Sequence, residues 1–366
     1  MLYPYYWPLY KAGGPVQSLF NLAHACQKFA QFVFLSKSTD IDGSSPLHSL
    51  LINRWQRGLH QEEILYLKKI SAFSILRAIR DSKPDLIYVN GIFHWHTSLI
   101  GLLLARIHGA KVVISPRGML QSWALDRGRH KKLLYIFIFK LLVRKNDIWH
   151  ATDEQEKFDI QRVFGGRVST FLAPNIPRGI SKSVPLELDK TSQKIKLVFL
   201  SLINANKNLH LVIDAVSRLS EKFSLDIFGP IIDEQYWKNC LNRMGKAGNI
   251  SYKGAVPPWE VSTVLSQYHF FILPTQGENF GHAIFDALAS GVPVIVSKNC
   301  PWRDLENQRA GFYIEDLNST GVQDALVKAH SLTEMQYHEI RQSSASYAAQ
   351  YISSRDYLTE YSFLLN

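Results

Sequence analysis

The stretch PTQGENFGHAIFDALASG, residues 274–291, decides the fold class of this chain. It directly follows the apolar run His269–Leu273, which has the length and composition of a buried strand. After a glycine-bearing loop, apolar residues recur at helical spacing over Phe280–Ser290, and a second strand-like run, Val292–Ser297, comes next. A strand, a helix and a strand in such close succession predict a parallel sheet covered by helices.

The same alternation of short apolar runs and longer amphipathic stretches extends over the whole chain. We expect further strands at Gln31–Ser36, Asp85–Asn90, Lys111–Ser115, Asp147–His150, Ser169–Leu172, Ile195–Ser201, Ser224–Phe228 and Ile250–Lys253. We expect further helices at Val16–Phe29, Gln61–Asp81, Thr97–His108, His130–Lys145, Asp153–Phe164, Asn208–Glu221, Glu234–Lys246 and Trp259–Gln267.

The rhythm breaks once, over residues 174–194, which hold three prolines and little apolar periodicity and therefore predict a linker. The sequence thus predicts two Rossmann-like, doubly wound α/β domains with parallel sheets, at residues 1–173 and 195–345. We expect a C-terminal helix within 346–366 to pack back on the first domain. Ligands of such folds bind at the carboxyl ends of the strands, so the cleft between two domains is the default site.

The composition is that of an ordinary globular protein, because 46% of the 366 residues are apolar and 20% are charged. The three cysteines are far apart and form no CxxC pair, which argues against a disulfide scaffold or a cysteine zinc site and fits a reducing compartment. No secretory signal opens the sequence, and no apolar run reaches the roughly 18–20 residues of a spanning helix. We therefore expect a cytoplasmic protein, attached at most to a membrane surface.

The net charge of +10 is unevenly distributed. Residues 1–180 hold 24 Lys and Arg against 12 Asp and Glu, whereas the remainder holds 17 against 19. The basic half should meet an anion, such as nucleic acid, a phosphorylated substrate or an anionic membrane. A nucleic-acid protein is disfavoured because no compact basic motif with interleaved aromatics is present, and a dinucleotide dehydrogenase because no GxGxxG follows an early strand.

Two carboxylates flank the predicted helix start in the stretch 274–291. Glu278 precedes the helix and Asp286 lies two turns along it, about 12 Å away along the helix axis. That is too far for an acid/base pair acting on one bond, for which about 5–10 Å is expected. It suits an elongated ligand with hydroxyls at both ends and a diphosphate between, held by the amides of the helix start. From spacing alone, a loop glutamate and a partly solvated aspartate remain the plainer interpretation.

The stretch resembles the Glu-x7-Glu signature of family-4-type retaining glycosyltransferases of the GT-B fold, with Glu278 at the first acidic position and Asp286 in place of the second Glu. The resemblance covers most of the chain and points to a bacterial surface-polysaccharide branch. The further segments that carry it are Ala12–Pro15, Ser115–Leu125, Trp149–Glu154, Ala173–Pro177, Gly254–Val256 and Cys300–Glu306.

The resemblance implies a role for each matching residue. Glu278 would contact the donor sugar, Asp286 the nucleotide ribose, and Lys207 the departing diphosphate, whose growing charge it would neutralise. Backbone amides of Asn279, Phe280 and Gly281 would bind the diphosphate, and the Gly13-Gly14 turn would let the backbone approach a phosphate or the acceptor closely.

Two features depart from the family pattern. Leu202 occupies the arginine position of the Arg-x4-Lys diphosphate clamp, so either another cation substitutes, such as Arg303 or one from the basic first domain, or donor binding is weakened. Only Met1-Leu2-Tyr3 stands where the family has a full first strand, which leads us to expect a longer natural start or an impaired protein. A catalytically impaired nucleotide-sugar-binding pseudo-enzyme is therefore the alternative.

Three basic residues follow predicted strands of the first domain. We place His94, His96 and Arg117 at the acceptor or the diphosphate; a loop histidine is also a common structural residue, and arginine acts only through its charge. The two histidines are too few for a metal site. The resemblance implies a metal-independent enzyme without a cofactor.

The stretch 127–145 places basic clusters around an apolar helix, with Lys131 and Lys132 before it and Arg144 and Lys145 after it. It fits a helix in a membrane interface and, equally, a core helix with solvated ends. The family resemblance implies transfer of a sugar, with retention, from a UDP- or GDP-linked donor to a glycan acceptor, and the basic stretch favours an acceptor at a membrane. That acceptor would be linked to polyprenyl diphosphate on the inner face of the cell membrane, in O-antigen (lipopolysaccharide), capsule or exopolysaccharide biosynthesis.

Overall fold

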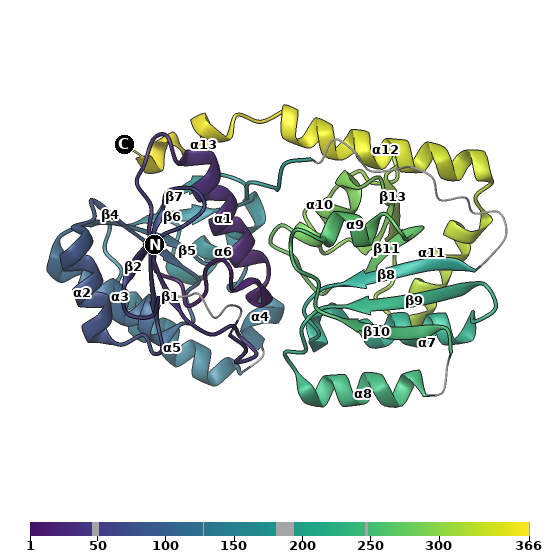
Figure 1. Ribbon diagram of the computed structural model, residues 1–366, viewed down its shortest axis with the longest axis horizontal. Helices are drawn as coiled ribbons and strands as arrows, with labels where there is room; N and C mark the ends of the chain where they lie inside the picture. The colour runs from purple at the N-terminus through teal and green to yellow at the C-terminus, as the bar shows by residue number, and fades with distance from the viewer. Residues whose placement is uncertain (46–50, 127, 181–193, 246–247, 366) are drawn as a thin grey trace. The chain divides into compact units, whose positions relative to one another are not determined.

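The chain folds into two units, Met1–Ile176 with Asp356–Asn366 (unit 1) and Pro177–Arg355 (unit 2). The computed structural model describes residues 1–45, 51–126, 128–180, 194–245 and 248–365 (Figure 1). Most of the predicted linker, residues 181–193, lies outside the described part. The chain returns to unit 1 at Asp356, ten residues later than the start of the expected C-terminal segment.

Unit 2 is built on one parallel sheet of six strands in the order β10-β9-β8-β11-β12-β13. The strands are β8 (Ile195–Leu200), β9 (Phe223–Phe228), β10 (Ile250–Gly254), β11 (Phe270–Leu273), β12 (Val294–Ser297) and β13 (Gly311–Ile314). The helices are α7 (Leu209–Arg218), α8 (Glu234–Met244), α9 (Val261–Leu265), α10 (His282–Ala289), α11 (Ser319–Ser331) and α12 (Glu334–Ser353). The order reverses between β8 and β11, so the loops that follow these two strands meet at the position where doubly wound sheets bind ligands.

Unit 1 contains two groups of strands. The parallel group has the order β4-β5-β6-β7, and the other has the order β1-β3-β2. The strands are β1 (Val33–Lys37), β2 (Trp55–Arg57), β3 (Glu63–Leu67), β4 (Leu86–Asn90), β5 (Lys111–Ser115), β6 (Ile148–Ala151) and β7 (Ser169–Leu172). The helices are α1 (Gly14–Cys26), α2 (Ala72–Ser82), α3 (Gly101–His108), α4 (Ser122–Asp126), α5 (Arg129–Leu142), α6 (Glu154–Phe164) and α13 (Tyr357–Leu365). The prediction of two parallel-sheet α/β domains with the GT-B architecture is confirmed.

A single residue, Leu2, joins the two strand groups of unit 1. It forms parallel bridges to Leu35 of β1 and to Val89 of β4. Its amide donates to the Tyr88 carbonyl at 2.8 Å, and its carbonyl accepts from the Asn90 amide at 3.1 Å. The bonds to β1 come from neighbouring residues, because the Leu35 amide donates to the Met1 carbonyl at 3.3 Å and the Lys37 amide donates to the Pro4 carbonyl at 2.8 Å. Residues 1–4 together therefore satisfy backbone groups of β1 and β4 at the position where the family pattern has a central strand.

The prediction of one helix over Gln61–Asp81 is wrong. The segment contains β3, which pairs in parallel with β1 from Val33↔Glu63 to Lys37↔Leu67, and then α2. The side chains from Ile64 to Leu67 are all buried, so pairing and burial outweigh the helical spacing of the apolar residues. Ser71 caps α2 through a capping box and marks the boundary between strand and helix.

The C-terminal helix α13 packs in unit 1 against α1 (Figure 1). The Tyr361 side chain is buried there, and its hydroxyl donates to the Pro174 carbonyl at 2.9 Å. This contact connects the last helix to the end of the strand region of unit 1.

Candidate functional site

The loops after β8 and β11 are bonded to each other at the reversal of the strand order in unit 2. The Gln276 amide donates to the Asn206 carbonyl at 2.8 Å, and the Asn208 side chain donates to the Pro274 carbonyl at 2.9 Å. Asn208 adopts a left-handed backbone conformation with φ 51°, which ends the short 3₁₀ turn Ala205–Lys207. The two loops thus hold their side chains in a fixed relation.

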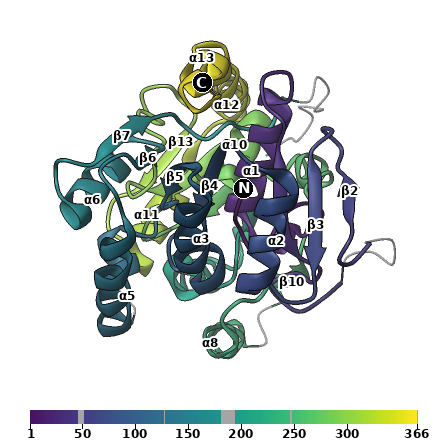
Figure 2. The same cartoon turned by 90° about the vertical axis from the view of Figure 1, so that its left-hand side faces the viewer.

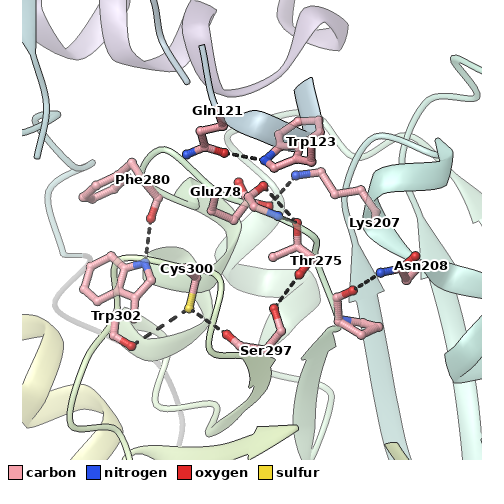
Figure 3. A network of polar contacts seen from close by, with 12 residues as sticks. Gln121, Trp123, Lys207, Asn208, Thr275, Glu278, Phe280, Ser297, Cys300 and Trp302 are labelled. Atoms are coloured by element: carbon pink, nitrogen blue, oxygen red, sulfur yellow. Dashed lines mark hydrogen bonds and ion pairs between the residues drawn. The ribbon is translucent and has the colours of Figure 1, made fainter. Parts of the chain in front are cut away.

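This arrangement brings Lys207 and Glu278 together. The Lys207 ammonium donates to the Glu278 carboxylate as an ion pair (Figure 3). Only 12% of the Lys207 side chain and 14% of the Glu278 side chain is exposed. A cation and a carboxylate that are so poorly hydrated interact more strongly than a surface pair, and both remain partly accessible to a ligand.

The loop that carries Glu278 is held from behind. The Ser297 hydroxyl donates to the Thr275 carbonyl at 2.6 Å (Figure 3), and the Glu278 amide donates to the Asn299 carbonyl at 3.0 Å. The Thr275 hydroxyl donates to the Gly277 carbonyl at 3.0 Å. These bonds fix the backbone of the loop and leave the Glu278 side chain to face Lys207.

Helix α10 begins at His282, two residues later than predicted, with Gly281 as its N-cap at φ 77°. No side chain caps this helix start, so its first amides can point at a bound anion. A Cβ on residue 281 would lie 2.9 Å from Ile284 Cδ1 and 3.4 Å from Trp302 Nε1, which explains the glycine. The Trp302 indole N–H also donates to the Phe280 carbonyl at 2.6 Å (Figure 3). Asn279, Phe280 and Gly281 therefore form the turn that leads into this helix start.

Asp286 lies in the middle of α10 and is half-buried. Burial raises the pKa of its carboxyl, and the nearby Arg178 guanidinium acts in the opposite direction. Sequence reasoning missed Arg178, because it lies at the start of unit 2, 108 positions before Asp286, in a segment without a recognisable motif.

Leu202, at the arginine position of the clamp, is half-buried and offers no charge. Arg303, one proposed substitute, is exposed, and its guanidinium donates to the Lys298 carbonyl at 2.8 Å. The charge of Arg178 acts on an acidic residue of this site, Asp286, whereas the Arg303 guanidinium bonds the Lys298 carbonyl.

In unit 1, the Gly13-Gly14 turn precedes α1. Gly13 has φ 80°, and its amide donates to the Tyr10 carbonyl at 3.0 Å. The Lys11 amide donates to the Asp40 carboxylate at 3.0 Å, so the turn is tied to the loop after β1. This turn lies, as predicted, at the start of the first long helix, and its role in donor binding stays a prediction.

Arg117 is buried, with 8% of its surface exposed, and has a left-handed backbone with φ 56°. Its Nε donates to Asn90 Oδ1 at 2.7 Å, one Nη donates to the Tyr88 hydroxyl at 3.0 Å, and the other donates to Asn175. The guanidinium thus links the ends of β4 and β5 to the segment after β7. This placement fits a structural role at least as well as the predicted contact with acceptor or diphosphate.

The two histidines lie after β4. Burial, with a smaller effect of the Lys37 charge, lowers the pKa of His94 to about 4, so its imidazole is neutral near pH 7. Its ring packs edge-on against Tyr3, with centroids 5.3 Å apart. His96 is half-buried in the π-helical segment Trp95–Ile100. Among the described residues, no group of three or more His, Cys, Asp or Glu side chains is placed to hold a metal ion.

Helix α5 has one buried face and one exposed apolar face. Ile136 and Phe139 are buried, whereas four apolar side chains point to solvent with exposed fractions of 50% (Leu133), 63% (Leu134), 62% (Phe137) and 72% (Leu141). We call these four residues the α5 apolar face. Figure 2 shows α5 at the periphery of unit 1.

The four cations predicted beside this helix divide into two kinds. Lys131, Arg144 and Lys145 are exposed. Lys132 is half-buried, donates to the Ala124 carbonyl and lies 5.3 Å from the centre of the Phe93 ring. Three of the four are thus available to an anionic surface. In the part of the chain that the structure describes, no helix is long and apolar enough to cross a membrane.

Comparisons with known proteins find a glycosyltransferase family model that matches part of the chain and solved structures with a similar fold. Residues 185–346 match the family "Glycosyl transferases group 1". The structure is similar to Anabaena HepE in complex with UDP and glucose, with a TM-score of 0.72 and 15% sequence identity over 97% of this chain and 95% of that chain. It is also similar to WaaG, a glycosyltransferase involved in lipopolysaccharide biosynthesis, with a TM-score of 0.66 and 12% identity over 99% and 97% of the two chains.

Among curated proteins, an uncharacterized 41.2 kDa protein in the cps region of Klebsiella pneumoniae is 23% identical over 242 residues. The match covers 61% of this chain and 63% of that protein, less than two thirds of its length. The chain therefore has the GT-B fold, and the matched region together with these neighbours supports a glycosyltransferase.

Proposed function

We propose that the protein transfers a sugar from a nucleotide diphosphate-sugar to a glycan acceptor with retention of the anomeric configuration. The observation that carries the proposal is the Lys207–Glu278 pair beside the uncapped start of α10. The ammonium and the helix-start amides supply positive charge for the leaving diphosphate, and Glu278 supplies acceptors for sugar hydroxyls. Because these groups provide the charge, we propose a metal-independent reaction that needs no cofactor besides the donor.

The donor is UDP- or GDP-linked in this proposal, and UDP is the first candidate. Anabaena HepE has been solved with UDP-glucose, with a TM-score of 0.72 to this structure. In this chain, Asp286 would accept hydrogen bonds from the ribose hydroxyls, and the α10 start would receive the phosphates. In unit 1, His94, His96 and Arg117 are assigned to the acceptor or the diphosphate, and Gly13 and Gly14 are assigned to the donor.

For the acceptor, we propose a glycan linked to polyprenyl diphosphate, in the biosynthesis of capsule, O-antigen or exopolysaccharide. The cps region of the Klebsiella pneumoniae relative and the lipopolysaccharide role of WaaG support this class of pathway. A lipid-linked acceptor requires the enzyme to work at the inner face of the cell membrane, as a cytoplasmic peripheral protein.

The α5 apolar face supports this location. Full burial of a Leu or Phe side chain gains on the order of 1.5–3 kcal/mol, and each cation near an anionic surface adds about 1 kcal/mol. Lys131, Arg144 and Lys145 flank the four apolar residues, which is the pattern of a helix lying in a membrane interface. One face of α5 is core and the other is exposed, and contact of the exposed face with a membrane is our proposal.

The membrane part is tested by vesicle sedimentation with anionic and with neutral vesicles. The double variant Leu134→Glu with Phe137→Glu should lose binding to anionic vesicles, while Leu241→Glu, at an exposed leucine of unit 2, should keep it. Equal binding of all three proteins would remove α5 from the membrane contact.

The transfer part is tested by nucleotide release from a panel of UDP- and GDP-sugars with a polyprenyl-diphosphate-linked saccharide. The wild type should turn over one donor, and Glu278→Gln should abolish most of that turnover. Leu202 favours one alternative, a pseudo-enzyme that binds the nucleotide without transfer. Donor binding without turnover over the whole panel would support that alternative.

A further inference from the structure

A buried hydrogen-bond network in unit 1 ends at Arg117. One Nη of Arg117 donates to the Tyr88 hydroxyl at 3.0 Å, and the same hydroxyl is hydrogen-bonded to Nδ1 of His150. The other ring nitrogen of His150, Nε2, lies 2.7 Å from the Ala173 carbonyl oxygen. Tyr88 lies on β4 and His150 on β6, and both side chains are buried. We call these four residues the Arg117 network, which connects the segment after β7 to the loop after β5.

The hydrogen bonds of the Arg117 network have one direction. A carbonyl oxygen only accepts, so Nε2 of His150 carries a proton. Burial, together with the Arg117 charge, lowers the pKa of His150 to about 3, so the ring is neutral near pH 7 and its Nδ1 is an acceptor. Burial also raises the pKa of Tyr88, so its hydroxyl keeps the proton that it donates to Nδ1. The lone pairs of the Tyr88 oxygen therefore remain for the Arg117 guanidinium.

The imidazole of His150 is held in this orientation by two aromatic rings. It stacks on Phe171 of β7 with ring centres 4.6 Å apart, and it lies edge-on to Tyr361 of α13 at 5.4 Å. The Tyr361 hydroxyl donates to the Pro174 carbonyl at 2.9 Å, next to the carbonyl that His150 contacts. Because these neighbours restrict rotation of the imidazole, its two nitrogens keep their different partners.

Tyr88 is one of three neutral groups that hold the Arg117 side chain. Nε of Arg117 donates to Asn90 Oδ1 at 2.7 Å, and the second Nη donates to the Asn175 side chain. The guanidinium also lies 5.9 Å from the centre of the Tyr88 ring. The rigid fork of the guanidinium is thus fixed by neutral oxygens, and the contacts that fix it do not cancel its charge.

The backbone at Arg117 is held by a separate set of bonds. Arg117 and Gly118 have φ values of 56° and 76°, a left-handed pair that a long side chain adopts only where the surroundings require it. The Gly118 amide donates to the buried Glu156 carboxylate at 2.6 Å, and the Thr152 amide donates to the same carboxylate at 2.9 Å. A substitution at Tyr88 or His150 therefore leaves these bonds of the loop in place.

We propose that Tyr88 and His150 are positioning residues, which hold the Arg117 guanidinium in one orientation for the phosphate group that it binds during sugar transfer. This inference rests on the proposed function, in which Arg117 meets the acceptor or the diphosphate. His150 acts through Tyr88, because the proton on Nε2 makes Nδ1 the acceptor that turns the Tyr88 oxygen towards the guanidinium. Both residues are buried and influence the ligand only through Arg117.

A purely structural role of the Arg117 network is the competing explanation. Both explanations predict a lower melting temperature for Tyr88→Phe, because His150 and Arg117 each lose a buried hydrogen bond. They differ in their predictions for transfer by the folded variant. A positioning role predicts that transfer falls, and that the loss depends on the guanidinium at position 117.

The experiment measures nucleotide release at varied donor and acceptor concentrations for the wild type, Tyr88→Phe, His150→Phe, His150→Asn, Arg117→Lys and the double variant of Tyr88→Phe with Arg117→Lys. Tyr88→Phe keeps the ring and removes the hydroxyl, and we expect kcat/KM to fall about tenfold, the size of a lost charge-assisted hydrogen bond. His150→Phe should reproduce this loss, and His150→Asn, whose side-chain oxygen can accept from Tyr88, should recover part of it.

Arg117→Lys keeps the charge and loses the fork, so it should itself lower transfer and make the further effect of Tyr88→Phe smaller. The KM that rises in Tyr88→Phe, that of the donor or that of the acceptor, identifies the phosphate that Arg117 binds.

Tyr66→Phe is the matched control. Tyr66 is another buried tyrosine of unit 1, and its hydroxyl donates to the Trp7 carbonyl. The control should lower the melting temperature and leave kcat/KM unchanged. A second readout does not depend on activity: ¹⁵N NMR of histidine-labelled protein, with His150→Phe to assign the resonance, should show a neutral His150 ring with its proton on Nε2.

Four results would overturn the proposal: wild-type kcat/KM in folded Tyr88→Phe, wild-type kcat/KM in Arg117→Lys, a loss that persists undiminished in the Arg117→Lys background, or a His150 proton on Nδ1. Should Tyr88→Phe fail to fold, the comparison of His150→Phe with His150→Asn tests the same prediction. If the wild type released nucleotide from none of the donors, the proposed function would fail first, which is distinct from wild-type turnover that ignores Tyr88 and His150.

Discussion

The Lys207–Glu278 ion pair makes an unusual prediction for the variant Glu278→Gln. The ammonium that should bind the diphosphate is paired with Glu278. Donor binding must therefore exchange one anionic partner of Lys207 for another. Replacing the carboxylate by a neutral amide removes the competitor, and it also removes a negative charge that repels the diphosphate. The variant should bind UDP more tightly than the wild type while losing transfer.

The size of the effect follows from the burial of the pair. Exposed ion pairs contribute about 0.2–1 kcal/mol, and removing one partner of a fully buried pair costs about 3–5 kcal/mol. With 12% and 14% of the two side chains exposed, this pair lies between these limits. In the wild type, UDP binding breaks this ion pair, and the new pair between Lys207 and the diphosphate compensates part of the loss. We therefore expect the binding free energy of UDP to be more favourable by about 1 kcal/mol in Glu278→Gln, or roughly fivefold in affinity.

Calorimetric titration of UDP at fixed ionic strength measures this gain. Glu221→Gln, which neutralises an exposed glutamate of unit 2, corrects for the general change in charge. Nucleotide release from the donor in the presence of acceptor reports transfer in the same preparations. A UDP affinity that drops in Glu278→Gln would refute the reasoning, because Glu278 would then support the nucleotide and not compete for Lys207.

Four further predictions concern α10 and its surroundings. Burial raises the pKa of Asp286, so UDP affinity should weaken as pH falls through that pKa and the carboxylate is protonated; the ratio of wild-type to Asp286→Asn affinity, in which the titration of UDP itself cancels, should therefore fall with pH by calorimetry. The same raised pKa means that wild-type unit 2 loses stability relative to Asp286→Asn as pH rises from below the ordinary value of 3.8 through the raised one, which a pH series of melting temperatures would reveal or exclude. Trp302→Phe removes the bond to the Phe280 carbonyl and should destabilise unit 2 by about 1–2 kcal/mol, and an unchanged denaturant midpoint would show that the bond contributes nothing. Gly281→Ala places a Cβ 2.9 Å from Ile284 Cδ1 at φ 77° and should cost about 1–2 kcal/mol and weaken UDP, whereas wild-type stability and affinity would mean that the loop relaxes freely.

The sequence was sufficient for most of the fold because strands and helices alternate with different periods. The strand Lys111–Ser115 and the strand Ser169–Leu172 are found at the predicted bounds. The prediction failed at Gln61–Asp81, where consecutive apolar residues fit both a buried strand and one face of a helix. Only pairing with β1, a segment about 30 residues away, decides for the strand.

The candidate site could be predicted residue by residue but not as an arrangement. The family resemblance singled out Lys207 and Glu278, yet nothing in the sequence indicates that these residues, 71 positions apart, form an ion pair with each other. The sequence could not predict that the charge of Arg178 acts on Asp286, because this effect depends on the path of the chain where it enters unit 2. For α5, the sequence left two interpretations open, since a pattern of apolar residues does not say which of two apolar faces the core will cover.

The central claim is that unit 2 binds a nucleotide diphosphate through Lys207. Its most direct test is calorimetric titration of UDP and of GDP into the wild type and into Lys207→Ala, with Lys222→Ala as a control at an exposed lysine of unit 2. We predict that one of the two nucleotides binds to the wild type and to the control, and that Lys207→Ala binds it at least about tenfold more weakly. Equal affinity in wild type and Lys207→Ala, or no binding of either nucleotide to the wild type, would contradict the account.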